Sequence, residues 1–225
     1  MKKIPHHLGI ILDGNRRWAR ERGLPTLEGH KKGLEKLKKV VEWCDEKGIK
    51  ILTVFVFSTE NWKRSKKEID YLMKLAKKAM SYDLREISKR GYRIRVIGER
   101  KRLPKFLQTA IEKVEKETKN NKKMIINFAL SYGGRGEIVE AVKRIIKKKI
   151  PPEKVTEDLI SKNLWASDLD MIIRTGKEQR ISNFLIWQAA YSELFFLKKY
   201  WPAFTKKDLE RALLDYSKRQ RRFGR

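Results

Sequence analysis

Residues 13–18, Asp-Gly-Asn-Arg-Arg-Trp, combine the groups needed to hold a diphosphate. The glycine lets the backbone approach a ligand, the start of a helix offers free N–H donors, and two arginines add positive charge. Asp13 would repel such an anion unless a cation lay between them, and Mg²⁺ is usually held by one or two carboxylates together with substrate phosphates. Asp13 is therefore a candidate metal ligand, although an ordinary turn is the commoner explanation of Asp-Gly-Asn taken alone.

Two further polar clusters follow other apolar runs. Residues 57–64 read Phe-Ser-Thr-Glu-Asn-Trp-Lys-Arg, and residues 174–182 read Arg-Thr-Gly-Lys-Glu-Gln-Arg-Ile-Ser. The second of these again suits a diphosphate, with three cations, a glycine and a serine hydroxyl around a turn. The first is equally typical of a plain loop before a helix. Two anion-binding clusters favour a reaction that joins two phosphorylated substrates, and the glycine motifs of nucleotide-binding proteins are absent from the sequence.

Three residues outside these clusters are ambiguous. His30 can donate to a phosphate, but a solvated or core-edge histidine is the commoner case. Glu193 is an acid in an otherwise apolar stretch, which is costly unless the carboxylate is paired or metal-bound. Its aromatic neighbours more often indicate a core or a subunit interface. The single cysteine, Cys44, excludes a disulfide framework and a cysteine-based zinc site.

The elements that position these clusters alternate between strands and helices. Continuous apolar runs predict strands at residues 8–12, 51–57, 93–97, 124–129, 171–173 and 194–197. Helical spacing predicts helices at residues 28–47, 104–118, 135–149, 156–163, 181–191 and 206–219. One more helix should begin with a capping box formed by Ser65 and Glu68, include Leu84 and Ile87, and stop at Gly91.

This alternation predicts one α/β domain over residues 1–225. We expect a central, mostly parallel sheet flanked by helices, with the functional site at the carboxyl ends of the strands. The longest apolar run is shorter than the roughly 18 residues of a membrane-spanning helix. The N-terminus has no signal-peptide pattern, so the mature chain should begin at or near Met1. These features predict a cytoplasmic protein.

The charge is the most unusual feature of the composition. A formal net charge of +27 on 225 residues indicates a polyanionic partner, which is a nucleic acid, an acidic membrane surface or a phosphorylated substrate. Hydrophobic residues make up 40% of the chain, enough for a packed core. The excess charge therefore decorates a globular surface and does not indicate disorder.

In this order, the clusters resemble the motifs of the cis-prenyltransferase family, the undecaprenyl diphosphate synthase-like isoprenyl transferases. The resemblance runs from about His7 to Gly224. Besides residues 13–19, 57–64 and 174–184, it includes Gly-His at 29–30, Tyr-Gly-Gly-Arg at 132–135, Trp-Gln-x-Ala-Tyr-x-Glu-Leu at 187–194 and Arg-Arg-Phe-Gly at 221–224. It implies Mg²⁺-dependent condensation of isopentenyl diphosphate with an allylic diphosphate, farnesyl or geranylgeranyl, giving a medium-chain polyprenyl diphosphate for a lipid carrier.

The same resemblance assigns roles to individual residues. Asp13 and Glu193 would bind Mg²⁺, and Asp13 and Asn61 would be catalytic. The allylic diphosphate would be held by Gly14, Asn15, Arg16, Arg17, His30 and Arg64, and Trp18 and Trp62 would border that site. Isopentenyl diphosphate would be held by Arg174, Arg180 and Ser182, with Ser58 near the departing proton. The expected substrate-binding set is completed by Thr59, Glu60 and Ile181.

The resemblance also implies an assembly and a tunnel. Family members are typically homodimers in which a terminal Arg-x-Gly, here Arg222 and Gly224, reaches the neighbouring active site. A hydrophobic tunnel between the sheet and the helices would hold the growing chain and shield a carbocation from water, with the helix after Ser65 as one wall. The preferred allylic primer stays open, because four positions depart from the usual bacterial residues: Arg16, Thr26, Lys177 and Gln179.

Two other classes of protein explain parts of the sequence. A nucleic-acid-binding protein would use the positive charge for phosphate contacts and the six tryptophans for stacking. The basic residues are, however, spread over several predicted helix faces, and this class leaves Asp13 and Glu193 unexplained. A non-catalytic partner subunit of the same family would lack Asp13. We therefore expect no nucleic-acid partner, and we attribute the excess charge to peripheral contact with the anionic inner face of a membrane.

Overall fold

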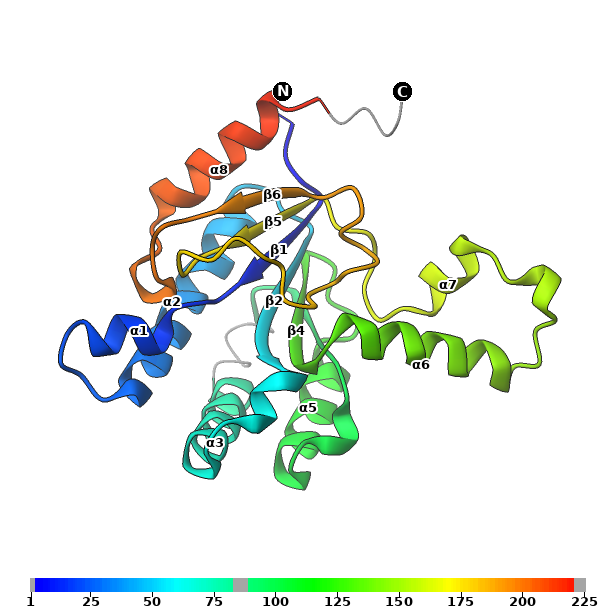
Figure 1. The fold of residues 1–225 in the computed structure, drawn as a ribbon, viewed down its shortest axis with the longest axis horizontal. Helices are drawn as coiled ribbons and strands as arrows, with labels where there is room; N and C mark the ends of the chain where they lie inside the picture. The colour runs from blue at the N-terminus through cyan, green and yellow to red at the C-terminus, as the bar shows by residue number, and fades with distance from the viewer. Residues whose placement is uncertain (1–2, 83–88, 221–225) are drawn as a thin grey trace.

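The computed structural model describes residues 3–82 and 89–220, which form a six-stranded sheet. Helices pack around this sheet (Figure 1). The strands are β1 (His7–Ile11), β2 (Ile51–Ser58), β3 (Tyr92–Ile97), β4 (Met124–Tyr132), β5 (Met171–Arg174) and β6 (Glu193–Phe196). Their order is β3-β4-β2-β1-β5-β6, and every neighbouring pair is parallel. All six predicted strands are confirmed, and the sheet that was expected to be mostly parallel is wholly parallel.

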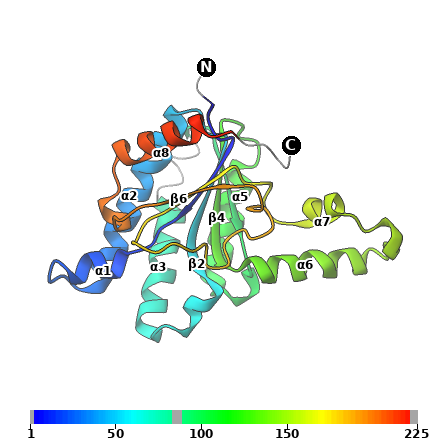
Figure 2. The ribbon, with the colours of Figure 1, turned by 45° about the horizontal axis from the view of Figure 1, so that its top comes forward.

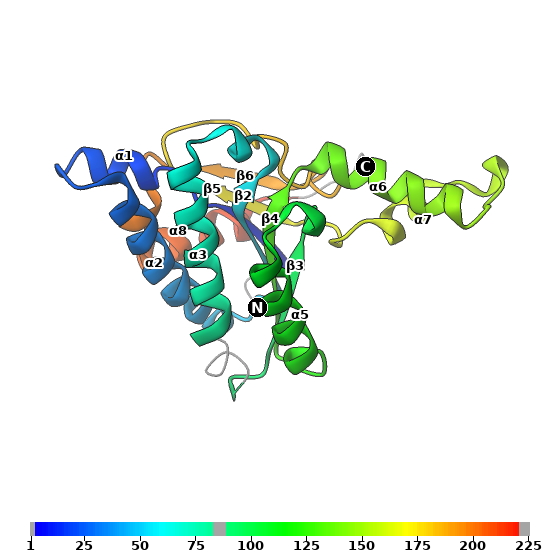
Figure 3. The same cartoon turned by 90° about the horizontal axis from the view of Figure 1, so that it is seen from below.

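Four amphipathic helices cover one face of this sheet (Figure 3). They are α2 (Thr26–Glu46), α3 (Lys66–Tyr82), α5 (Lys105–Thr118) and α8 (Lys206–Lys218). Their apolar residues share one buried cluster with Leu8 and Ile10 of β1. Because successive strand side chains point to opposite faces, Ile11 lies in a second buried cluster, together with Phe184 and Leu185. The sheet is therefore buried on both faces, as expected for parallel strands.

Two further helices form an arm that projects away from the sheet. They are α6 (Gly134–Lys147) and α7 (Glu157–Asn163), which Figure 2 shows on the far side of β4 from α2. The predicted helices at 28–47, 104–118, 135–149, 156–163 and 206–219 are all present, and each end agrees within two residues. Their boundaries follow the periodic apolar spacing that was used to predict them.

The helix predicted at residues 181–191 is wrong. The segment is a series of turns, with positive φ at Ser182, Asn183 and Leu185 (49°, 64° and 44°). A right-handed helix cannot contain such residues. The backbone N–H of Gly134 donates to the Asn183 carbonyl at 2.8 Å, and the N–H of Arg135 donates to the Asn183 side chain at 2.9 Å. The segment 181–191 thus forms hydrogen bonds with the N-terminus of α6 in place of the internal hydrogen bonds that a helix would have.

The capping box predicted at the start of α3 is only half formed. The N–H of Glu68 donates to Ser65 Oγ at 3.4 Å, as expected. The Glu68 carboxylate, however, turns away from the helix end and accepts hydrogen bonds from Arg64 and His30. The predicted continuation of this helix through Leu84 and Ile87 lies outside the described residues.

A buried chain of hydrogen bonds links three neighbouring strands. His7 Nδ1 lies 2.9 Å from the carbonyl of Asp168, which can only accept, so Nδ1 carries the proton. His7 Nε2 therefore accepts from Thr53 Oγ1 at 2.7 Å, and Thr53 Oγ1 accepts from Asn127 at 2.9 Å. Burial lowers the pKa of His7 from 6.5 to about 4. The hydrogen bond to the Asp168 carbonyl raises this pKa, but its effect is smaller than that of burial. His7 is thus a neutral structural residue of the sheet.

This pKa makes the stability of the fold depend on pH. Below about pH 6.5 the unfolded chain binds a proton at His7 that the folded chain does not bind until about pH 4. The contribution of His7 to stability therefore falls as the pH drops through this window, by up to about 3 kcal/mol. In His7→Gln we expect this part of the pH dependence to be lost, measured by urea unfolding at a series of pH values. The exposed His6, changed to Gln, is the matched control and should leave the pH dependence as in the wild type.

Candidate active site

A cavity of about 290 Å³ opens at the carboxyl end of β1, where the chain turns into α1 (Asn15–Arg20). Gly14 precedes this helix with a φ of 103°, and a Cβ there would lie 2.5 Å from the Tyr200 ring, so the position requires glycine. We call this space the first basic cavity. Its lining is Leu12, Asp13, Gly14, Asn15, Arg16, Arg17, Arg20, His30 and Arg64.

One buried carboxylate, Glu68, holds two of these arginines and His30 together. It contacts Arg64 at 3.0 Å, His30 Nε2 at 3.3 Å and Arg16 at 3.6 Å. Burial, and then the charge of Arg64, lower the pKa of His30, which favours the neutral imidazole. The Nε atom of Arg16 is buried and has no hydrogen-bond partner in the described part of the chain. An unsatisfied buried donor among converging cations fits a site built for an anion.

A second group of polar side chains surrounds Arg174 at the end of β5. The buried Arg174 guanidinium donates to Ser182 Oγ at 2.9 Å and to the backbone carbonyl of Arg180. Gly176 has a φ of 98°, and a Cβ there would lie 2.7 Å from Cγ of Asp13. Glycine therefore lets this turn pass close to Asp13. We call Arg174, Arg180 and Ser182 the second arginine cluster.

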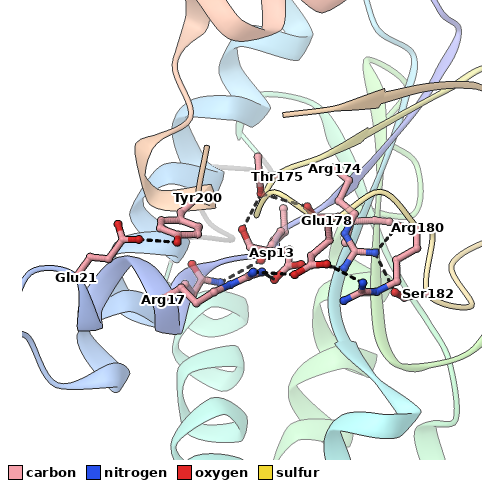
Figure 4. A network of polar contacts seen from close by, with 12 residues as sticks. Asp13, Arg17, Glu21, Arg174, Thr175, Glu178, Arg180, Ser182 and Tyr200 are labelled. Carbon is pink, nitrogen blue, oxygen red and sulfur yellow. Dashed lines mark hydrogen bonds and ion pairs between the residues drawn. The ribbon is translucent and has the colours of Figure 1, made fainter. Parts of the chain in front are cut away.

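Two carboxylates join the first basic cavity to the second arginine cluster (Figure 4). Asp13 accepts from Arg17 at 3.0 Å and from Arg174 at 2.8 Å. Glu178 accepts from Arg17 at 2.9 Å and from Arg180 at 2.7 Å. Partial burial disfavours the charged form of Arg17, but the contacts with Asp13 and Glu178 outweigh this effect and raise the pKa of Arg17. Hydrogen bonding by Arg17 and the charge of Arg180 lower the pKa of Glu178. Three cations against two anions leave net positive charge for a polyanionic ligand.

The loop after β2 adds uncharged donors and acceptors beside the two clusters. Ser58 donates its N–H to Asn61 Oδ1 at 3.2 Å, and its side chain accepts the Asn61 N–H in return. This reciprocal pair fixes the loop as a capped turn. Glu60 accepts from the Asn183 side chain at 3.3 Å. Three of the predicted site residues, Ser58, Glu60 and Asn61, thus lie at one cavity wall.

Four other members of the expected substrate-binding set lie beside the cavities and do not line them. Trp18 packs with Arg22, whose guanidinium carbon lies 4.6 Å from the ring centre. Thr59 lies against the backbone of the β4–α6 turn, Trp62 packs against the first apolar cluster, and Ile181 packs against the second. These residues support the walls of the site.

The two cationic groups stand at the mouth of a much larger cavity of about 1030 Å³. It extends between the sheet and the helices α2 and α3, which lie side by side in Figure 3. We call it the main cavity. Its interior is lined by aliphatic and aromatic side chains that include Leu34, Leu37, Val41, Phe57, Leu72, Ala76 and Met80. The predicted hydrophobic tunnel, with α3 as one wall, is confirmed.

The structure does not bring Glu193 near Asp13 within one chain. Glu193 begins β6 and is paired with Met171, which is level with Leu8, whereas Asp13 lies two residues beyond β1. At about 3.3 Å per strand residue, the two backbone positions are roughly 16 Å apart along the strand direction. The Glu193 carboxylate accepts a hydrogen bond from Arg219 instead. Asp13 and Glu193 of one chain therefore do not share a metal site, and the expectation that both residues bind Mg²⁺ stays a prediction.

The described residues include only some of those expected to bind a metal ion or to reach a neighbouring active site. No three His, Cys, Asp or Glu side chains among residues 3–82 and 89–220 gather closely enough to hold a metal ion by themselves. Asp13 places a single carboxylate between two cationic groups, which fits an Mg²⁺ ion held by one carboxylate and by the oxygens of bound diphosphates. Arg222 and Gly224, expected to serve a neighbouring site, lie outside the described residues.

The fold and this site together fit the class of enzymes that act on phosphorylated substrates with apolar tails. The family model described as "Putative undecaprenyl diphosphate synthase" matches residues 11–224. An isoprenyl transferase of Bacillus thuringiensis is 46% identical over 98% of this chain and 88% of its own. A tritrans,polycis-undecaprenyl-diphosphate synthase (geranylgeranyl-diphosphate specific) of Pyrococcus horikoshii is 47% identical over 99% of this chain and 88% of its own.

A solved structure is similar over the whole fold. Lavandulyl diphosphate synthase from Lavandula x intermedia, in complex with dimethylallyl diphosphate, has a TM-score of 0.94 and 36% identity, and the match covers 99% of each chain. The chain therefore belongs to the cis-prenyltransferase family, the undecaprenyl diphosphate synthase family, and is a prenyltransferase.

Two site residues, Glu68 and Glu178, were missing from the set expected from sequence. Glu68 was assigned to a capping box, which is a local pattern and conceals a contact with His30 on another helix. Glu178 stands inside the cationic stretch 174–182, where an acid among cations was a usable signal. The contacts of both carboxylates depend on which segments the fold places together.

Proposed function

We propose that this chain catalyses Mg²⁺-dependent cis-prenyl chain elongation. The enzyme would condense isopentenyl diphosphate repeatedly with an allylic diphosphate and release a medium-chain polyprenyl diphosphate for a lipid carrier. The observation that carries this proposal is one continuous cavity with two cationic groups at its mouth and an apolar interior. Diphosphate groups need the charged mouth, and a growing hydrocarbon chain needs the apolar interior. The unit that performs this is residues 1–225 as a single domain.

The two cationic groups would bind different substrates. The first basic cavity would hold the allylic diphosphate through Arg16, Arg17, His30 and Arg64, with backbone donors at Gly14 and Asn15. The second arginine cluster would hold isopentenyl diphosphate. This assignment follows from family resemblance, and the geometry supports it because Asp13 touches an arginine of each group. The two reacting carbons would thus be held side by side.

The reaction requires a leaving diphosphate to be stabilised and a cation to be kept from water. The C1–O bond of the allylic substrate breaks, and its electron pair leaves with the diphosphate, where the arginines of the first basic cavity neutralise the developing charge. Bound Mg²⁺ would add to this neutralisation beside Asp13. The isopentenyl double bond attacks C1, and loss of a proton leaves a cis double bond. The hydrogen-bonded pair Ser58 and Asn61 stands at the cavity wall where that proton would depart.

The primer is proposed from the relatives and the sequence together. The P. horikoshii relative is named as geranylgeranyl-diphosphate specific, and Arg16 matches archaeal and eukaryotic members of the family. Geranylgeranyl diphosphate is therefore our first choice of primer, and farnesyl diphosphate is the second. A cavity of about 1030 Å³ is large enough for a chain well beyond either primer.

The activity is tested by incubating the purified protein with Mg²⁺, labelled isopentenyl diphosphate and, separately, dimethylallyl, geranyl, farnesyl and geranylgeranyl diphosphates. Chromatography of the dephosphorylated products should show a ladder that ends at a defined length. Asp13→Asn should lower kcat/KM by about 100-fold or more, because it removes charge at the reacting centre. Asp158→Asn, on the exposed surface of α7, is the control and should match the wild type. No elongation with any primer would instead favour a non-catalytic partner subunit.

We propose that the protein is a homodimer built on the α6 arm. Val139, Val142 and Ile146 lie on one face of α6 and are 51%, 41% and 68% exposed. Adjoining exposed apolar residues of this kind are typical of protein interfaces. A second copy covering this stripe would agree with the family. Metal ligation by Glu193 would then have to serve the partner chain, because Asp13 of its own chain is too distant.

Breaking this stripe should separate the subunits. We expect the double change Val139→Glu and Ile146→Glu to convert the wild-type dimer to a monomer in light scattering, because it places two charges in an apolar contact. Lys113→Glu, on the exposed face of α5, is the control and should remain dimeric. A wild-type chain that is monomeric at all concentrations measured would refute the dimer proposal.

We also propose peripheral contact with an anionic membrane at the cytoplasmic face. No described helix is both long and apolar enough to cross a membrane. The formal charge is +27, and α3 alone carries exposed lysines at 74, 77 and 78. Basic surfaces are attracted to anionic lipid at about 1 kcal/mol per charge near the surface. Contact would bring the hydrophobic product to the bilayer that receives it.

Vesicle flotation tests this contact directly. The protein should float with vesicles that contain anionic lipid, and flotation should weaken as salt is added, because exposed charges are screened. The triple change of lysines 74, 77 and 78 to glutamate should weaken it further. Equal flotation with neutral and anionic vesicles would contradict an electrostatic contact.

A further inference from the structure

The main cavity has a second charged end that the proposed chemistry does not use. Among the described residues that line it, the charged side chains gather in two places. One place is the mouth with its two cationic groups. The other consists of Lys38 and Glu42 on α2 and Arg90 just before β3. The described lining between these places is otherwise mainly apolar.

The second charged end lies a full cavity length from the mouth. His30 stands at the mouth and Glu42 at the far end, twelve residues later on α2. At 1.5 Å per residue this is about 18 Å along the helix. On the sheet side, the lining runs from Ser58 at the carboxyl end of β2 to Tyr92 at the amino end of β3. The cavity thus follows the whole length of the strands.

An ion pair stands at this far end. The Arg90 guanidinium lies 2.8 Å from the Glu42 carboxylate, and the two side chains are 48% and 44% exposed. The charge of Glu42 raises the pKa of Arg90. Next to the pair, Tyr92 donates its hydroxyl to Asp45 at 2.8 Å, and Lys123 contacts the same carboxylate at 2.6 Å. Polar side chains that are exposed to solvent therefore lie next to the last apolar side chains of the cavity lining.

The free energy of adding a unit to a growing hydrocarbon chain therefore differs in sign between the apolar part of the cavity and its charged far end. Within the apolar part, each added unit buries more hydrocarbon and is favourable. At the far end, a longer chain would have to cover the Glu42–Arg90 pair and remove its water without replacing the lost hydrogen bonds. Growth is therefore favoured up to the pair and opposed beyond it.

We propose that the Glu42–Arg90 ion pair determines product length, as a polar stop at the far end of the main cavity. The inference rests on the proposed chain elongation and deepens it by naming the residues that end it. They lie far from the reacting groups. Changes at the pair should therefore alter where elongation ends without altering how fast each bond forms.

The test compares product lengths between variants. The double variant E42L/R90L replaces the pair by apolar side chains and should yield a main product longer by at least one isoprene unit. Its initial rate of isopentenyl incorporation should equal that of the wild type. Products are made with Mg²⁺, isopentenyl diphosphate and geranylgeranyl diphosphate, or farnesyl diphosphate if only that primer is extended. They are then dephosphorylated and measured by reversed-phase chromatography and mass spectrometry.

Two matched variants control this comparison. E46L/K206L removes another ion pair of α2, which does not line the cavity, and should give the wild-type length. E42R/R90E exchanges the two charges but keeps the pair, and should also give the wild-type length. Both controls distinguish a polar stop from a general loosening of α2.

An unchanged product length in E42L/R90L would overturn the inference. If that variant does not fold, E42M/R90M makes the same comparison with flexible, unbranched apolar side chains, with a longer product as support and an unchanged length as refutation. Absence of any polyprenyl product from the wild-type protein would overturn the proposed function itself, an outcome distinct from products of unaltered length.

Discussion

The contact between Asp13 and Arg174 is the interaction on which the site depends. The two residues are 161 positions apart, and their side chains meet at 2.8 Å because β1 and β5 are neighbouring parallel strands. Parallel pairing brings the carboxyl ends of both strands to one edge of the sheet. From this edge Arg17 and Glu178 extend the contact, so that the first basic cavity and the second arginine cluster share one mouth.

The same sheet sets the shape of the space behind that mouth. α2 and α3 run along one face of the strands and leave a cavity between them, so its length follows from the length of the strands. An apolar interior suits a hydrocarbon and excludes water from a reactive cation. Charge is thus concentrated at the mouth and at the pair Glu42–Arg90, while the packed interior stays apolar. This separation is what a chain-elongating enzyme requires.

Sequence patterns succeeded where structure depends on near neighbours. Six apolar runs predicted six strands, and helical spacing predicted five helices within two residues, because both patterns record which side chains face a core. They failed at residues 181–191, where apolar spacing occurs without a helix. There Ser182, Asn183 and Leu185 adopt positive φ, and Asn183 is bonded to the start of α6. A contact with a distant segment outweighed the local preference.

By itself the sequence determined the α/β class, the three polar clusters, the candidate metal ligand Asp13 and the family resemblance. Only the tertiary structure decided which charges meet. Glu68 looked like a helix cap but binds His30 and Arg64, and Glu193 looked like a partner of Asp13 but lies at the other end of the strands. The physical reason is the separation in sequence between the residues that interact. Periodicity and capping involve residues a few positions apart, whereas ion pairs between segments depend on strand order and register, which local patterns do not encode.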